Sequence, residues 1–214
     1  MVGSEADSQL TRNEENLLKP LLFCDVETTG LSGSDEVLEL ALVDEQEKVV
    51  FQKRFGTVRI KKWPHAQKIH GIKPSDVSDL PPLSVYAKEL NSISKGHDIV
   101  FYNSAYDTKY MGRYLHPSCS VYCAMLTHDR LYQRRSLTAA LSDHGIASSD
   151  LTAHSAAGDC IATARLWKFM KQNRMFQPVC TKSGSVEALL SMLDTKLVFA
   201  GLAGLCILIA ACVH

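Results

Sequence analysis

Short runs of apolar residues dominate the first third of the chain and predict strands. The apolar runs at 21–24, 37–43 and 49–55 have the length of buried or half-buried strands. The polar stretch 44–47 supplies a turn between the last two runs, so we expect them to form an antiparallel hairpin.

Further along, short apolar runs alternate with segments of helical spacing. Residues 99–102 and 121–123 predict a fourth and a fifth strand, and the spacing of apolar residues predicts helices over 83–93, 105–115, 137–143 and 156–170. Strands first, followed by alternating strands and helices, predict an α/β fold. We therefore expect a mixed five-stranded sheet flanked by helices, in a folded domain over residues 20–172.

The two ends of the chain differ from this domain. Residues 1–19 are polar, 173–196 have the composition of a linker, and 197–213 contain no charged side chain. As a helix, 197–213 would be about 25 Å long, the short end of what crosses a hydrocarbon core of about 30 Å. Its apolar surface on all sides favours a transmembrane anchor over a helix packed on the domain or bound to a partner. Basic residues ahead of it place the folded domain on the cytoplasmic side.

The amino-acid composition restricts the classes of protein to which the chain can belong. The chain has 214 residues, of which 46% are hydrophobic and 21% charged, as in globular proteins. The 23 basic and 23 acidic residues cancel, which excludes binding to nucleic acid through bulk positive charge. Seven cysteines and an N-terminus without a signal-peptide pattern predict reduced thiols in a cytosolic compartment.

Acidic residues follow the ends of the predicted strands. Asp25 and Glu27 are two positions apart after the first apolar run, so both side chains lie on one face of the sheet. Paired carboxylates repel each other unless a cation lies between them, and their oxygens suit Mg²⁺ or Mn²⁺. Such pairs also occur on ordinary surface strands, so this pair alone does not establish a metal site.

Three more residues complete the candidate chemistry. Asp107 follows the fourth strand near the start of a helix, and Asp159 lies near the start of the last helix, where a carboxylate is also favoured by the helix dipole alone. His154 precedes Asp159 by five residues, which is not a spacing along one helical stripe. His154 must therefore lie ahead of the helix if both reach one site.

Taken together, these residues resemble the DEDDh family of 3′→5′ exonucleases. This family includes polymerase proofreading subunits, ribonuclease T and the animal three-prime repair exonucleases. Its three motifs correspond to Asp25-x-Glu27-Thr-Thr-Gly30, Asn103-x-x-Tyr106-Asp107 and His154-x₄-Asp159, and the segments 68–72 and 136–141 are also similar. Tyr102 and Tyr106 stand where the family often has His and Phe. The resemblance spans residues 20–172 and implies a ribonuclease H-like fold.

The resemblance also implies a reaction. Asp25, Glu27 and Asp159 would bind one Mg²⁺, Asp25 and Asp107 a second, and Mn²⁺ would substitute for both. Two such ions activate the attacking water and stabilise the leaving oxygen of a phosphodiester. His154 would be the general base, since an imidazole accepts protons near neutral pH.

Substrate contacts are implied in the same way. Thr28 and Leu31 would lie against the terminal nucleotide, and Ile69 and Tyr106 would line its pocket; core packing is the alternative for Leu31 and Ile69. Five basic residues form a candidate rim for the strand backbone or an ordinary solvated face: Lys109, Arg113, Arg130, Arg134 and Arg135. The implied activity releases nucleoside 5′-monophosphates from single-stranded DNA with a free 3′ end. A 3′→5′ exoribonuclease and a non-catalytic nucleic-acid-binding module are the alternatives.

Overall fold

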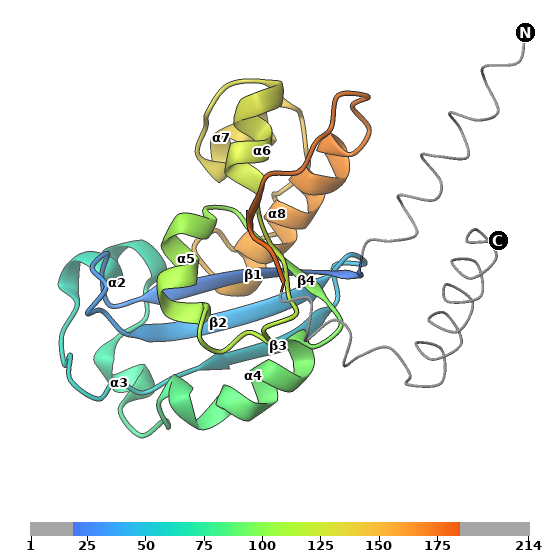
Figure 1. The fold of residues 1–214 in the computed structure, drawn as a ribbon. Coiled ribbons are helices and arrows are strands. Elements are labelled where there is room, and N and C mark those ends of the chain that lie inside the picture. Colours follow the sequence, from blue (N-terminus) through green and yellow to red (C-terminus); the bar gives the residue numbers. More distant parts are fainter. Residues whose placement is uncertain (1–18, 185–214) are drawn as a thin grey trace, which may run out of the picture.

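A single mixed sheet of six strands organises the molecule (Figure 1). The computed structural model describes residues 19–184. The strands lie in the order β3-β2-β1-β4-β5-β6, with β1 to β3 antiparallel, β4 and β5 parallel to β1, and β6 antiparallel to β5. Their bounds are β1 (Leu21–Thr28), β2 (Val37–Asp44), β3 (Val49–Arg54), β4 (Asp98–Phe101), β5 (Val121–Cys123) and β6 (Cys180–Lys182).

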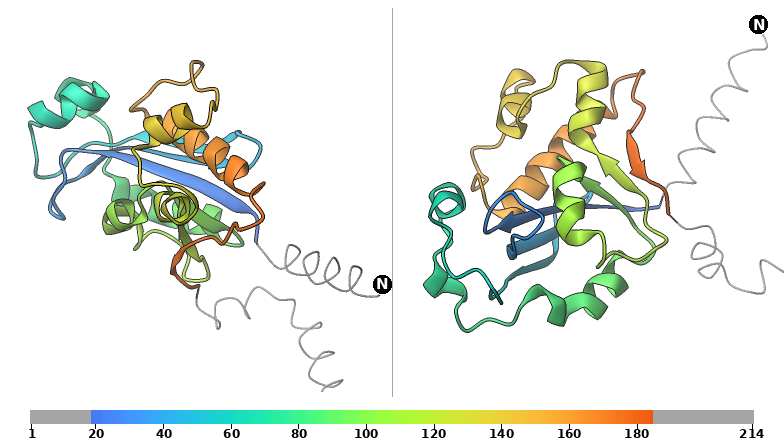
Figure 2. Two further views of the ribbon diagram at one scale, coloured as in Figure 1. Left: turned by 90° about the horizontal axis from the view of Figure 1, so that it is seen from above. Right: turned by 60° about the vertical axis from the view of Figure 1, so that its left-hand side comes forward.

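Helices cover both faces of this sheet (Figure 2). Between β3 and β4 the chain forms α2 (Pro64–His70), α3 (Pro74–Val77), the 3₁₀ helix η1 (Leu83–Tyr86) and α4 (Ala87–Ser94). The remaining helices are α5 (Ser104–Met111), α6 (Ala124–Leu131), α7 (Leu137–Asp143) and α8 (Ala156–Met170). Residues of α4 and α5 belong to the hydrophobic core on one face, and residues of α7 and α8 to the core on the other.

The alternation of side chains along β1 decides which face carries the acidic pair. Leu22 and Val26 pack with α4 and α5, whereas Leu21 and Phe23 pack with α8. Because side chains in a strand alternate with period two, the odd-numbered Asp25 and Glu27 continue the face covered by α8. The first strand thus changes on this face from core residues to carboxylates within its own length.

The sheet has six strands, one more than the five that the sequence predicted. The sixth strand, β6, lies within 173–196, the segment expected to be a linker, and pairs with β5. It has three residues, all exposed, so it carries no alternation of apolar and polar residues that sequence reasoning could detect. Helix α6 was also not expected, and α5 ends at Met111, earlier than the predicted 115.

Neither end of the chain is part of this description. The predicted apolar helix at 197–213 and residues 1–18 of the polar N-terminal segment lie outside the described residues. Within 19–184, no helix is long and apolar enough to cross a membrane. The membrane anchor therefore stays a prediction from the sequence.

Candidate active site

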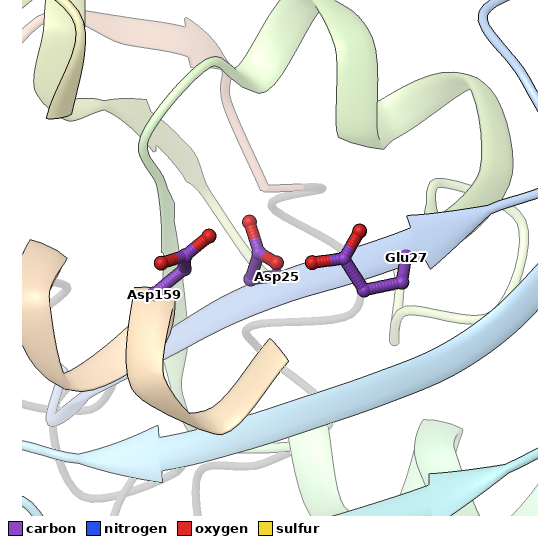
Figure 3. Close-up of side chains that lie close together, drawn as sticks. All are labelled: Asp25, Glu27 and Asp159. Carbon is purple, nitrogen blue, oxygen red and sulfur yellow. The ribbon is translucent and has the colours of Figure 1, made fainter. Parts of the chain in front are cut away.

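Three carboxylates from two elements converge where β1 meets the start of α8 (Figure 3). Asp25 and Glu27 extend from β1, and Asp159 from the first turn of α8. One carboxylate oxygen from each lies within 4.8 Å of the other two. Ser155 begins the helix by accepting a hydrogen bond from the Gly158 N–H at 3.2 Å, which fixes the turn that carries Asp159.

Asp107 approaches the same strand from the opposite face of the sheet. It lies in the first turn of α5, is 3% exposed, and its carboxylate is hydrogen-bonded by the backbone of Val26. It is not one of the three residues whose oxygens lie within 4.8 Å of one another. Its charge nevertheless acts on that group, because it raises the pKa values of both Asp25 and Glu27.

Burial and mutual repulsion raise the pKa values of these carboxyl groups and so oppose their ionisation. Burial raises the pKa of Glu27 to about 8, with the charge of Asp159 the next contribution, and burial raises the pKa of Asp107 to about 8. The pKa of Asp25 is held well above its ordinary value by burial and then by Asp107 and Asp159. Within residues 19–184, no Lys or Arg forms an ion pair with any of the four carboxylates. A divalent cation would supply the missing positive charge.

Sequence reasoning missed one further acidic residue beside this group. Glu39 on β2 lies directly opposite Glu27 in the β1–β2 register and is 4% exposed. Its carboxylate accepts a hydrogen bond from Gln52 Nε2 at 2.8 Å and lies 3.5 Å from Arg54 Nε. The signal in the sequence is a single charge inside the apolar run 37–43. Glu39 adds a negative charge directly opposite Glu27 on the neighbouring strand, and Arg54 lies close enough to balance that charge.

His154 lies at the entry to α8, as its spacing from Asp159 requires. It is exposed, immediately precedes the capping residue Ser155, and has a positive φ of 55°. A hydrogen bond from its backbone and the charge of its ring both lower the pKa of Asp159, against a larger rise caused by burial. The His154 side chain is thus open to solvent, and its charge acts on Asp159.

Thr28 and Tyr106 lie together at the end of β1. The Thr28 hydroxyl donates to the carbonyl oxygen of Gly30 at 2.6 Å, and its oxygen is 2.5 Å from the Tyr106 hydroxyl. Tyr106 also hydrogen-bonds to the Gly30 carbonyl at 3.0 Å, and Tyr110 to the Ser32 carbonyl at 2.8 Å. Side chains of α5 therefore fix the loop that follows β1, and the Thr28 side chain is buried within this contact.

Leu31 and Ile69 are not core residues. Leu31 is 80% exposed and Ile69 is 61% exposed, which argues against core packing as the reason for either. His70 connects their two segments: its Nε2 lies 3.2 Å from the Thr28 carbonyl oxygen, and its Nδ1 accepts the Ile72 N–H at 3.0 Å. Since Nδ1 is the acceptor, Nε2 carries the proton and donates to Thr28. This contact holds the segment that carries Ile69 against the end of β1. The loop that carries Leu31 follows the same end of β1.

The five candidate basic residues have different surroundings. Arg135 pairs with Asp143 at 2.8 Å and Arg134 with Asp129 at 3.9 Å, as on an ordinary solvated face. Lys109 and Arg113 on and beyond α5 line a cleft of about 350 Å³ together with Arg59, a cation that sequence reasoning missed. Residues of the β1–β2 loop line part of this cleft, and none of the candidate carboxylates does.

Comparisons with known proteins agree with this geometry. A family model described as an exonuclease, RNase_T, matches residues 22–167. A solved structure of Exonuclease X in complex with 5′ overhanging duplex DNA is 26% identical, with a TM-score of 0.57, and the match covers 72% of this chain and 92% of that one. A search of curated protein sequences finds no match.

Two further structures share the fold at lower identity. The nuclease domain of 3′hExo, a DEDDh family member bound to rAMP, is 15% identical with a TM-score of 0.63, covering 78% of this chain and 98% of that one. Product-bound exonuclease I is 18% identical with a TM-score of 0.58, covering 73% of this chain and 44% of that one. The sheet and its helices therefore match those of nucleases whose substrates differ.

Proposed function

We propose that this chain, which belongs to the DEDDh family of 3′→5′ exonucleases, releases nucleoside 5′-monophosphates from single-stranded DNA. The family establishes a nuclease with a ribonuclease H-like fold, and the substrate and product are our proposal. The observation that carries it is the convergence of Asp25, Glu27 and Asp159 within 4.8 Å, with His154 beside them.

The carboxylates fit divalent cations by charge and by donor type. Their raised pKa values and the absence of a Lys or Arg partner within 19–184 mean that an added cation would favour ionisation of the group. Asp25, Glu27 and Asp159 would hold one Mg²⁺, and Asp25 with Asp107 a second, with Mn²⁺ able to substitute. Bound ions of this kind supply positive charge to a phosphodiester and increase the acidity of water.

The remaining residues position the substrate and accept a proton. His154 is solvent-exposed and adjacent to Asp159, so its imidazole can take a proton from a water molecule that attacks beside the carboxylates. Leu31 and Ile69 offer exposed apolar surface on which a terminal base can stack, and Thr28 and Tyr106 hold the loop beneath it. A single strand enters such a pocket without the cost of unpairing.

DNA is the favoured substrate, and RNA is the second candidate. Exonuclease X, the 26% identical protein, was solved with duplex DNA, whereas the 15% identical 3′hExo was solved with rAMP. No contact among the described residues distinguishes deoxyribose from ribose, so the comparison in sequence decides the order of the two candidates.

Digestion of matched 5′-labelled DNA and RNA strands with Mg²⁺, with and without EDTA, tests the proposal. We expect a ladder of shortened products from DNA, none with EDTA, and none from a strand whose 3′ end is blocked. His154→Ala is expected to lower kcat by about 10²–10⁴-fold with metal binding intact. Asp79→Asn, at an exposed site outside the cluster, is the control. Binding without cleavage would instead support a non-catalytic module.

We also propose, from the sequence alone, that residues 197–213 anchor the enzyme with its nuclease domain in the cytoplasm. Full-length protein should then resist extraction from membranes by alkaline carbonate. A chain ending at residue 184 should remain in the soluble fraction with equal activity per molecule. Aggregation of the shortened chain beside a freely soluble full-length protein would contradict the anchor.

A further inference from the structure

We propose that Arg165 is a positioning residue that holds the loop carrying His154 in its active arrangement. The inference rests on the proposed function, in which His154 is the general base. Arg165 lies on α8 six residues beyond Asp159, about 9 Å further along the helix, so it acts through the loop and not by touching substrate.

The Arg165 guanidinium holds two distant segments at once. Its Nη1 donates to the Ala147 carbonyl oxygen at 2.8 Å and to Asp150 Oδ1 at 2.7 Å, and its Nη2 donates to Asp150 Oδ2 at 2.8 Å. Its Nη2 and Nε donate to Glu47 Oε2 at 2.8 and 3.1 Å. These five hydrogen bonds use the full donor capacity of a guanidinium. With Asp150 the two donors meet the two carboxylate oxygens, the bidentate geometry in which arginine pairs are strongest, whereas with Glu47 both donors meet the single oxygen Oε2.

Arg165 itself is less exposed than the other arginines in ion pairs, although the side chains of its partners Glu47 and Asp150 are 38% and 59% exposed. The Arg165 side chain is 19% exposed, whereas the side chains of Arg54, Arg134 and Arg135 are 46–59% exposed in their pairs. Exposed ion pairs contribute little because water and salt screen them. Water therefore also screens the two carboxylates that face Arg165, and it is the joint loss of five hydrogen bonds that should be measurable.

The other end of the loop is also fixed by α8. The Ser155 hydroxyl donates to the Thr152 carbonyl oxygen at 2.8 Å and accepts the Gly158 N–H at 3.2 Å. A Cβ atom on Gly158 would lie 2.2 Å from the Thr152 oxygen, so the loop contacts the helix where only glycine fits. Arg165 thus fixes the loop at 147–150 and the helix start fixes it at 152–155, immediately beside His154.

The backbone at His154 explains why such tethering is needed. Its φ of 55° lies in the left-handed region, which costs a non-glycine residue energy and persists only when its surroundings impose it. Without the contacts at 147–150 the loop can relax toward ordinary backbone angles. The imidazole would then spend less time beside Asp159, and the chemical step would slow while substrate binding stayed the same.

A double-mutant comparison in the full-length protein tests this role. Arg165→Met keeps the apolar stem and removes all five hydrogen bonds, and we expect a kcat about tenfold lower with KM changed less than twofold. In a His154→Ala background, the same substitution should change kcat less than twofold. Lys171→Met is the matched control: Lys171 is the C-cap residue of the same helix and pairs with Glu45 of the same hairpin at 3.9 Å, and no hydrogen bond or ion pair among residues 19–184 joins its side chain to the loop.

Two further readouts separate positioning from general destabilisation. Amide hydrogen exchange over 147–154 should accelerate in Arg165→Met and remain unchanged in Lys171→Met. Asp150→Asn, which weakens the fork from the loop side and leaves α8 unchanged, should lower kcat severalfold with the same dependence on His154. This variant keeps the test available if Arg165→Met fails to fold.

Each outcome distinguishes this inference from the proposed function. Equal losses from Arg165→Met in the presence and absence of His154 would overturn the positioning role while leaving the exonuclease intact. An unchanged kcat in both Arg165→Met and Asp150→Asn would overturn it as well. Full activity in His154→Ala would instead overturn the assigned general base, and with it the premise of this inference.

Discussion

Removing one carboxylate from the cluster should stabilise the metal-free protein while destroying its metal site. The oxygens of Asp25, Glu27 and Asp159 lie within 4.8 Å of one another. At an effective dielectric constant of about 20, each ionised pair at that distance repels by about 3.5 kcal/mol. Asp25→Asn keeps the shape of the side chain and removes both of its pairwise repulsions, so the metal-free variant is expected to be more stable than the wild type.

The size of this gain depends on pH in a defined direction. The raised pKa of Glu27, about 8, means that the folded protein binds protons more tightly than the unfolded chain. Stability from such a group is fully present below the unfolded pKa and is lost as pH rises through the folded value. Folding of the metal-free wild type therefore costs more free energy as pH rises, and Asp25→Asn should relieve about 2–3 kcal/mol of that cost at pH 8, less than the repulsion of one fully ionised pair because protonation removes part of it. That corresponds to a Tm about 5–10 °C higher in EDTA.

Calorimetry in EDTA and in Mn²⁺ measures both effects. The Tm difference between Asp25→Asn and wild type should increase from pH 5 to pH 8, and Mn²⁺ should raise the Tm of the wild type but not of the variant. Asp79→Asn, at an exposed position, should behave as the wild type in every condition. A lower Tm for Asp25→Asn in EDTA, together with an undiminished Mn²⁺ response, would refute a metal site built from mutually repelling carboxylates.

Four other substitutions follow from the described contacts. Leu31→Ala or Ile69→Ala should raise KM for a single strand about 5–30-fold, since each removes about 1–2 kcal/mol of apolar contact with a base, and Tm should stay constant because both side chains are exposed. Gly158→Ala should destabilise the fold by about 1–3 kcal/mol in urea, because its Cβ would meet the Thr152 oxygen. Tyr106→Phe should cost about 1–2 kcal/mol of stability through the loss of its hydroxyl contacts at the end of β1, measured in the same way.

The elements that the sequence predicted best are those whose pattern is local. The helices Leu137–Asp143 and Ala156–Met170 have the predicted bounds, and β2 and β3 form the expected hairpin. Their apolar spacing, polar turn and capping residues lie within a few positions of each other. By contrast, β6 exists only because β5 offers it a pairing edge, which no local pattern in Cys180–Lys182 reveals.

In the candidate site, too, residues that follow a local pattern were predicted, and residues whose place depends on the folded chain were not. Asp25 and Glu27 were placed on one face by period two alone, and the structure has them there with Asp159. Glu39 was not assigned, because its importance comes from its register opposite Glu27, a property of strand pairing and not of the run 37–43. Arg165 was not noticed for a similar reason: its partners at 47, 147 and 150 come from two segments that only the folded chain brings together.

His154 and Asp159 are five residues apart, and the start of a helix between them changes which residues lie close to each other. Along a helix, neighbours are three or four residues apart, so a spacing of five argues against contact. Ser155, however, is the capping residue, which places His154 one position before the cap and Asp159 at the fourth helical position. These two positions pack against each other at the start of capped helices, because the chain turns back at the cap. The interaction of the His154 backbone with the Asp159 carboxylate lowers the pKa of Asp159 against the larger rise from burial, and the proposed base and the proposed metal ligand lie together because the helix begins between them.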